Sequence, residues 1–244
     1  MRKQLSKKEL MAGGLYLGVS IKGLHKTRLM GFLGWRGMLF GSQCGKAMPT
    51  TLATEIAQAA ARLIVEEGME YGPAKRRALK QIDAPSRTPL PDNDLVEEAV
   101  REHIALFCED TQPAELRALR SMALSWMERM AVFRPHLGGA VWNGTATRMS
   151  DIYLQLFCDD PKSAEIALID HGVDYEPGTV KGLHGKPVDV LSVGVFSREL
   201  GVVVGVHFLV YDLDDLRGAL RRDARGRAPR GDMAAVRQLL ESDL

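Results

Sequence analysis

The chain has 244 residues, of which 45% are hydrophobic and 26% are charged, a composition typical of a globular protein with its own core. It contains no apolar run of about 18 residues, so we expect no membrane partner, and its three cysteines form no Cys-x-x-Cys pair, which predicts reduced thiols in a cytoplasmic protein. Residues 1–50 hold nine Lys or Arg and one acid, which leaves a net charge of −7 on the remainder. An acidic body argues against nonspecific nucleic-acid binding through the folded part.

The first 47 residues are basic and rich in glycine, and they show no clear periodicity. They fit three interpretations: a secretory signal, a basic tail that touches nucleic acid or membrane, or an extension outside the native fold. The third is favoured, because periodic sequence begins only after Met48. The segment Gly41–Ala47 resembles a phosphate loop, but three residues instead of four separate its glycines, and Ala47 replaces the magnesium-binding Ser or Thr.

Residues 48–134 are predicted to form a helical module. An apolar stripe at helical spacing follows Thr51 and ends at Gly68, and Pro73 can begin a second helix. Prolines make residues 84–92 a loop, Asn93 or Asp94 caps a third helix, and Pro113 begins a fourth. The residues expected to face inward from the last two helices are Val96, Val100, Ile104, Phe107, Leu116, Leu119, Met122, Ala123, Trp126, Met130 and Phe133.

Residues 135–244 are predicted to form a small mixed-sheet domain, so the whole chain is expected to be α+β. Gly138 and Gly139 allow a tight turn, a polar loop leads to Ser150-Asp151, and an alternating strand follows to Phe157. Asp160-Pro161 then begins a helix that stops at Gly172. Further on, an apolar run over 202–210 predicts a buried strand, with His207 as a core or rim residue. Asp212 is expected to cap the helix that follows, and Asp232 is expected to cap the last helix.

This order of strand, loop, strand and helix resembles the nucleotidyltransferase superfamily, the fold of DNA polymerase beta. In that family, an apolar residue and Gly-Ser precede a loop that often ends in Gly-Thr-Ala, and Ser-Asp-x-Asp follows on a strand. Here Gly139 takes the place of the Gly, Gly144-Thr145-Ala146 takes the place of the loop end, and Ser150-Asp151 begins the acid pair without a gap. The family's third acid lies on a neighbouring strand, and Asp189 in Val188-Asp189-Val190 is its candidate.

The resemblance implies an NTP substrate and a magnesium or manganese cofactor, with Asp151 and Asp189 as catalytic and metal-binding residues. Carboxylates at positions i and i+2 of a strand share one face, and with a third acid they hold two ions that bind the triphosphate and activate the attacking oxygen. The residues expected to bind the nucleotide are Gly139, Ala140, Asn143, Gly144, Thr145, Arg148 and Ser150.

The sequence departs from the family pattern at several of these positions. Ala140 stands where the Ser should be, and Asn143 replaces a commonly basic loop residue. Tyr153 stands where the second acid should be, and a phenol is a poor magnesium ligand at neutral pH. Asp174 and Glu176 offer a substitute pair, although such a pair is more typical of the solvated face of an edge strand.

Two functions therefore stay open: a magnesium-dependent nucleotidyltransferase, and a catalytically degenerate member that binds a nucleotide, RNA or protein without turnover. A third, an ATP-dependent ligase of the UDP-N-acetylmuramate–alanine type, lacks support because its phosphate loop is missing. The segment Arg217–Arg230 holds six arginines that would suit the phosphates of a nucleotide or RNA, against the simpler interpretation of a solvated loop. The oligomeric state is not predicted.

Overall fold

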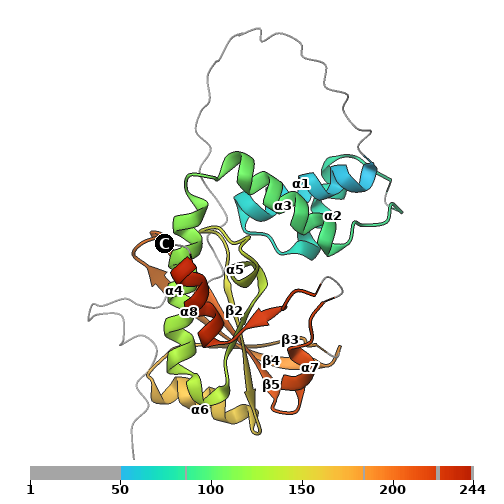
Figure 1. The fold of residues 1–244 in the computed structure, drawn as a ribbon. Coiled ribbons are helices and arrows are strands. Elements are labelled where there is room, and N and C mark those ends of the chain that lie inside the picture. The colour runs from blue at the N-terminus through green and yellow to red at the C-terminus, as the bar shows by residue number, and fades with distance from the viewer. Residues whose placement is uncertain (1–50, 86, 184, 224–225, 243–244) are drawn as a thin grey trace, which may run out of the picture. The chain divides into compact units, whose positions relative to one another are not determined.

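The computed structural model describes residues 51–242 except for 86, 184, 224 and 225, and all of these fall within one unit, Lys46–Leu244. The predictions for residues 1–47, including the segment Gly41–Ala47, lie outside the described residues. The described part is α+β, as predicted, with helices packed around a mixed six-stranded sheet (Figure 1). None of the helices in this part of the chain is long and apolar enough to cross a membrane.

The first three helices are α1 (Leu52–Glu67), α2 (Tyr71–Gln81) and α3 (Asn93–Phe107), and they share a hydrophobic core. Both predicted ends of α1 are confirmed. Thr51 accepts a hydrogen bond from the backbone amide of Thr54, and Gly68 ends the helix with a φ of 66°, in the left-handed region that favours glycine.

Two predictions about α3 are wrong. Its N-cap is Asp92, whose side chain accepts a hydrogen bond from the Leu95 amide at 2.7 Å, one residue before the predicted caps. Phe107, predicted to face inward, is 72% exposed, because it is the last residue of the helix and its ring lies beside His103 with the centroids 4.7 Å apart.

The fourth helix, α4 (Gln112–Arg129), packs with the sheet, since its buried residues belong to the same hydrophobic cluster as the strands. A short 3-10 turn (Ala131–Phe133) then leads into the sheet region. The remaining helices are α5 (Gly139–Asn143), α6 (Pro161–Asp170), α7 (Asp215–Ala219) and α8 (Met233–Ser242). The strands are β1 (His136–Gly138), β2 (Ile152–Cys158), β3 (Glu176–Lys181), β4 (Pro187–Ser197), β5 (Val202–Asp212) and β6 (Arg230–Gly231).

Side-chain caps fix the start of two helices in this region. Asp160 accepts a hydrogen bond from the Lys162 amide at the start of α6, and Asp232 accepts one from the Ala235 amide at the start of α8, as predicted. The predicted cap at Asp212 is wrong, because β5 extends through this residue and α7 begins after Asp214.

The strand order in the sheet is β3-β4-β5-β2-β1-β6. Strands β2 and β5 run parallel, and every other neighbouring pair is antiparallel. The strand β3 forms one edge, and all of its residues are exposed, in line with a solvated position for Glu176. The parallel pair is therefore central, and β4 is separated from β2 by β5.

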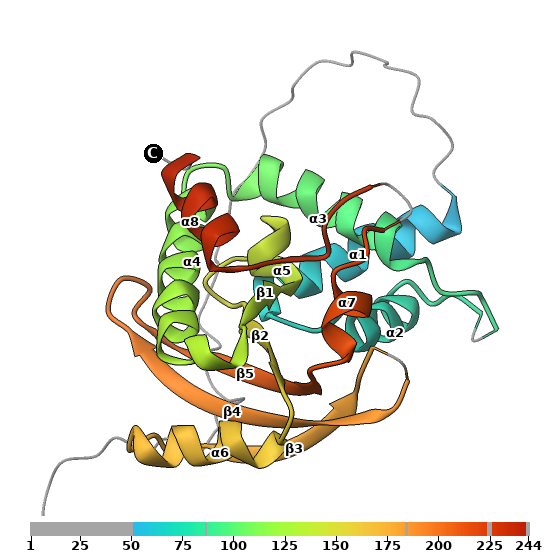
Figure 2. The same ribbon diagram turned by 60° about the horizontal axis from the view of Figure 1, so that its bottom comes forward.

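The two faces of the sheet differ in character. Ile152, Leu154 and Leu156 of β2 point into the main hydrophobic core, to which α4, α6 and α8 contribute side chains. The alternate residues of β2 point to the other face, where α7 packs near Phe157. Figure 2 shows α6 and α7 on opposite sides of the sheet. We call this other face the polar face, and it carries Asp151, Tyr153, Gln155, His136, Ser192, His207 and Arg230.

Candidate functional site

The Gly-rich turn lies next to the start of β2. Gly138 of β1 pairs with Tyr153 of β2, so the chain leaves β1 beside the beginning of the acid-bearing strand. Gly139 has a φ of 68°, and a Cβ at this position would lie 3.6 Å from Cδ2 of Tyr153. Glycine therefore suits the left-handed backbone here, while a Cβ would make only ordinary van der Waals contact with the Tyr153 ring.

Backbone amides in the loop after α5 are already hydrogen-bonded within the protein. The amide of Thr145 donates to the Ala140 carbonyl at 2.9 Å, and that of Arg148 donates to the Glu115 carboxylate at 2.9 Å. The amide of Ser150 donates to the Thr147 carbonyl at 2.8 Å, while its hydroxyl accepts from the Thr147 amide at 3.0 Å. The loop that was expected to bind a nucleotide is thus fixed in place, and these amides are not directed at a phosphate.

Side chains of the helices hold the same loop from the other side. Gln112 donates to the carbonyls of Gly144 and Ala146 at 3.1 and 2.9 Å, and Arg101 donates to the Asn143 carbonyl at 3.2 Å. These contacts join α3 and α4 to the segment that leads into Asp151.

Asp151 is held by two donors from β5. Its Oδ1 accepts the Gly205 amide at 2.9 Å, and its Oδ2 lies 3.3 Å from Nε2 of His207. A Cβ at Gly205 would lie 2.7 Å from Oδ1, so only glycine leaves room for this carboxylate. The Asp151 side chain remains 46% exposed, which leaves acceptor lone pairs directed to solvent.

His207 links Asp151 to a serine on the next strand. It pairs with Tyr153 across the parallel strands, and the two rings stack with centroids 4.9 Å apart. Its Nδ1 lies 2.9 Å from Oγ of Ser192. When the Ser192 hydroxyl donates to Nδ1, the ring proton of His207 lies on Nε2 and bonds the Asp151 carboxylate.

Tyr153 connects the sheet to the helices. Its hydroxyl donates to Oε1 of Glu70 at 3.2 Å, and Glu70 is the residue that precedes α2. Burial, together with the negative charges of Glu70 and Asp151, raises the pKa of Tyr153 well above its usual value. The phenol is therefore neutral at physiological pH, and its proton is engaged by Glu70.

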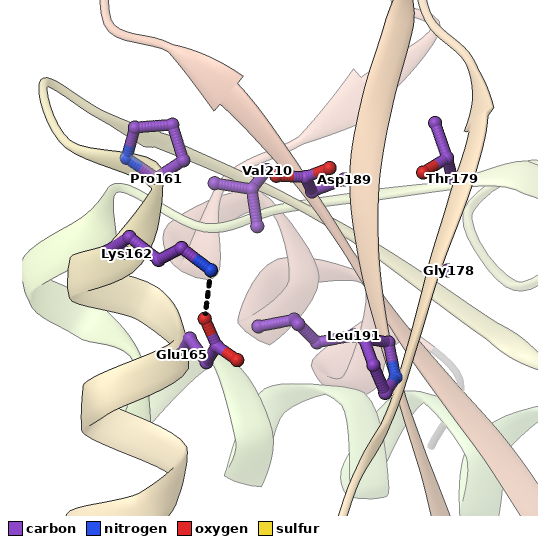
Figure 3. A pocket seen from close by; sticks show the side chains of 9 residues that line it. Pro161, Lys162, Glu165, Gly178, Thr179, Asp189, Leu191 and Val210 are labelled. Carbon is purple, nitrogen blue, oxygen red and sulfur yellow. Dashed lines mark hydrogen bonds and ion pairs between the residues drawn. The ribbon is translucent and has the colours of Figure 1, made fainter.

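The structure does not bring Asp189 to Asp151. Asp189 pairs with Val210, and Val210 pairs with Leu156, so Asp189 lies on the core face of the sheet and Asp151 on the opposite one. Asp189 instead lines a cavity of about 240 Å³ beside Lys162 and Glu165 of α6, which form an ion pair at 2.7 Å (Figure 3). The two carboxylates expected to share metal ions are thus on opposite sides of the sheet.

The reason for this difference is strand order. The prediction assumed that the strand containing Asp189 is the neighbour of β2, whereas β5 occupies that place. On β5, His207 lies opposite Tyr153 of β2, whereas the sequence predicted only a core or rim position for it. A continuous apolar run such as 202–210 is typical of a central parallel strand, and this signal could have placed β5 beside β2.

The residues present do not fit a two-ion magnesium site. Magnesium requires several oxygen ligands, yet Tyr153 offers a neutral phenol and His207 offers an imidazole nitrogen that suits softer metals. Within the described residues there is no group of three or more His, Cys, Asp or Glu side chains that could hold a metal ion. Asp151 is the only carboxylate among the three side chains gathered here, Asp151, Tyr153 and His207.

The arginine-rich segment is partly occupied by internal ion pairs. Arg227 bonds the Asp223 carboxylate at 2.8 Å, and it reaches Glu97 at 3.2 Å and Asp94 at 3.6 Å on α3. Arg217 and Arg221 are exposed, whereas Arg225 lies outside the described residues. The segment thus contacts the helices, and its arginines have distinct environments.

Comparison with known proteins gives little further guidance. No protein-family model matches this chain, and no curated protein sequence does. The Cid1 poly(U) polymerase with MgGTP bound is similar over 47% of this chain and 38% of its own, at 14% identity and a TM-score of 0.30. Cid1 in complex with the UTP analogue UMPNPP is similar over 47% of this chain and 36% of its own, at 13% identity and a TM-score of 0.29. Scores of this size do not establish a shared fold, so the site is interpreted from its own geometry.

Proposed function

We propose that this chain is a nucleotide-binding protein built on a nucleotidyltransferase-like framework, and that it does not carry out two-metal nucleotidyl transfer. The observation that supports this most is that Tyr153 stands at the position expected for the second acid and that the strand beside β2 presents His207, while Asp189 lies on the other face of the sheet. Asp151, Tyr153 and His207 lie together on the polar face, but only the first is a carboxylate.

The arrangement of Asp151 suits binding. Two donors from β5 orient the carboxylate, and its exposed lone pairs can accept hydrogen bonds from a ligand hydroxyl or amino group. A charge-assisted hydrogen bond of this kind contributes about 1.5–3 kcal/mol. Nucleotides carry such donors on the ribose and the base, in addition to their phosphates.

The full-length chain should be incubated with each α-labelled NTP, with Mg²⁺, with Mn²⁺ and with EDTA, and with RNA and the chain itself as acceptors. We expect no labelled product. Isothermal titration of the same nucleotides should give a Kd that changes by less than about twofold between Mg²⁺ and EDTA, because no carboxylate pair is present to bind the metal–nucleotide complex.

Asp151→Asn is the matched variant, since it keeps the shape of the side chain and removes the charge. A labelled product that requires Mg²⁺ and disappears in this variant would show that one carboxylate is sufficient for transfer and would overturn the proposal. The absence of binding for every nucleotide, with or without metal, would equally contradict it.

A further inference from the structure

Two neighbouring polar side chains on the polar face have buried atoms without hydrogen-bond partners. Among the described residues, Nε and Nη1 of Arg230 and Oε1 of Gln155 are buried and unpaired. Buried polar atoms in native proteins are nearly always hydrogen-bonded, to protein, water or ligand. Such atoms on two neighbouring side chains therefore indicate a place where another molecule completes the hydrogen bonds.

The two side chains are adjacent and their backbone is firmly held. A Cβ at Gly138 would lie 3.9 Å from both the Arg230 Cβ and the Gln155 Nε2, so Gly138 leaves the space that they share. The next residue, Gly231, packs against the Trp142 ring, and the Trp142 indole N–H donates to the Ala228 carbonyl at 2.8 Å. The backbone at Arg230 is thus fixed from both sides.

Arg230 differs from the other arginines of its segment. Arg227 is exposed and has acidic partners, whereas no carboxylate of the described residues lies within ion-pair distance of Arg230. Burial lowers the pKa of Arg230, and the neighbouring Tyr211 hydroxyl only partly opposes this effect. A guanidinium that is partly buried, with two unpaired nitrogen atoms and no carboxylate beside it, reduces the stability of the free protein and is prepared to bind an anion.

We propose that Arg230 and Gln155 form a subsite for a phosphate group, with the guanidinium bonding the oxyanion and the carboxamide oxygen accepting a ligand hydroxyl. Because the two nitrogen atoms are buried, the oxyanion reaches them only when a neighbouring side chain moves, and in this proposal the Gln155 carboxamide shifts while keeping its oxygen available to the ligand. The assignment of the ligand as a nucleotide rests on the proposed function, and the phosphate subsite does not.

The position of the subsite relative to Asp151 supports a phosphorylated ligand with polar groups at its other end. Arg230 is level with Tyr153 and two strands away from it, and Asp151 lies two residues before Tyr153, just ahead of β2. Neighbouring strands lie about 4.8 Å apart and each residue advances about 3.3 Å along a strand, so the Cα atoms of Arg230 and Asp151 are about 12 Å apart. A ligand on this face would bind its phosphate at Arg230 and offer hydroxyl or amino donors to Asp151.

The test uses Arg230→Met, which keeps the volume and removes the charge, and Arg221→Met, an exposed arginine of the same segment, as the matched control. Thermal unfolding of the full-length chain in EDTA should be followed with inorganic phosphate, pyrophosphate, each NMP and NTP, and single-stranded RNA. We expect Arg230→Met to raise the melting temperature of the free protein by about 2–4 °C, because an unpaired buried charge is lost. It should also raise the Kd of the phosphate probe that binds wild type about tenfold or more, and Arg221→Met should change neither value.

Several outcomes would overturn the subsite. If Gln155 and Arg230 bond each other in solution, Arg230→Met lowers the melting temperature and leaves phosphate affinity unchanged. If only Arg221→Met weakens binding, the exposed arginines bind the anion. Should Arg230→Met fail to fold, Arg230→Lys and Gln155→Met take its place. For each of them the Kd of the phosphate probe and the melting temperature of the free protein are measured in the same way.

The results also separate this inference from the proposed function. Binding of inorganic phosphate or pyrophosphate that depends on Arg230, without binding of any nucleotide, would keep the subsite and reject the nucleotide ligand. Nucleotide binding that is unaffected by Arg230→Met would keep the proposed function and reject the subsite. Binding of RNA but of no mononucleotide would assign the phosphate to a polymer.

Discussion

The space around Asp151 depends on one glycine. A Cβ at Gly205 would lie within 2.7–3.0 Å of Oδ1 and Cγ of Asp151 and of Nε2 of His207, distances at which something must shift. The Gly205 amide also donates to Asp151, so the same residue supplies both a donor and the room for its acceptor.

Gly205→Ala should therefore displace the carboxylate and destabilise the protein by about 1–3 kcal/mol, the range for inserting a methyl group into a packed site. Urea denaturation measures the loss, and the 15N–1H spectrum of the His207 side chain reports the broken bond to Asp151. Gly194→Ala is the matched control, because Gly194 pairs with Gly205 across β4 and β5 and its added Cβ would meet only Val203 Cγ1, at 3.4 Å. Equal losses in both variants would show that the cost lies in the strands and not in the site.

Residue-level sequence reasoning placed Asp151 at the site but not its partners. The Ser150-Asp151 motif and the turn at Gly139 were recognisable from local pattern, because both depend on residues close in sequence. His207 and Ser192 lie about 40 to 55 residues further along the chain. The contact of His207 with Asp151, and that of Ser192 with His207, arise only from strand pairing. Neither residue carries a local signal of such a role.

At the scale of elements, the short strand β6 is contacted by the Trp142 side chain in addition to its own ladder with β1. It has only two residues, and a Cβ at Gly231 would lie 2.2 Å from the Trp142 ring. The hydrogen bond from Trp142 to Ala228 fixes the segment just before the strand. Because α5 carries Trp142, this helix positions β6, and with it Arg230.

Trp142→Phe keeps an aromatic ring but leaves the Ala228 carbonyl without its donor. We expect hydrogen exchange of amides in residues 228–232 to become faster by about 5–10-fold, which corresponds to about 1 kcal/mol for one lost hydrogen bond. Amides in the centre of β4 and β5 provide the internal reference and should keep their protection. Unchanged exchange in 228–232 would mean that the pairing of β6 with β1 suffices to hold the strand.

Local signals predicted some helix ends, since Thr51, Asp160 and Asp232 cap helices and Gly68 ends one, but they missed Asp92 at the start of α3 and wrongly placed a cap at Asp212. The order of strands was not predictable in the same way. Whether β4 or β5 lies beside β2 depends on packing over the whole sheet, and Asp189 was misplaced as a result.

At the scale of the whole described unit, α1 to α3 have a core of their own but are tied to the loop before Asp151. The left-handed Gly68 approaches the Met149 carbonyl so closely that an added Cβ would lie 2.6 Å from its oxygen. Tyr153 and Glu70 add a hydrogen bond between β2 and the start of α2. The packing of these helices and the shape of the site are therefore coupled.

A double-mutant cycle with Tyr153→Phe and Glu70→Gln measures this coupling. We expect an interaction energy of about 0.5–1 kcal/mol from urea denaturation, modest because Glu70 is exposed. Tyr175→Phe with Glu165→Gln, a Tyr–Glu pair confined to the α6 region, serves as the comparison cycle. Additive effects of the first two substitutions would show that the hydrogen bond does not join the helices to the sheet.

The Tyr153–Glu70 hydrogen bond also has a physiological consequence. An aspartate at position 153 would place a second carboxylate beside Glu70 and near Asp151, and the three would repel one another until a divalent ion neutralised them. With tyrosine there, the same contact is made by a neutral donor. The contact between the start of α2 and the sheet therefore requires no divalent ion to neutralise neighbouring carboxylates.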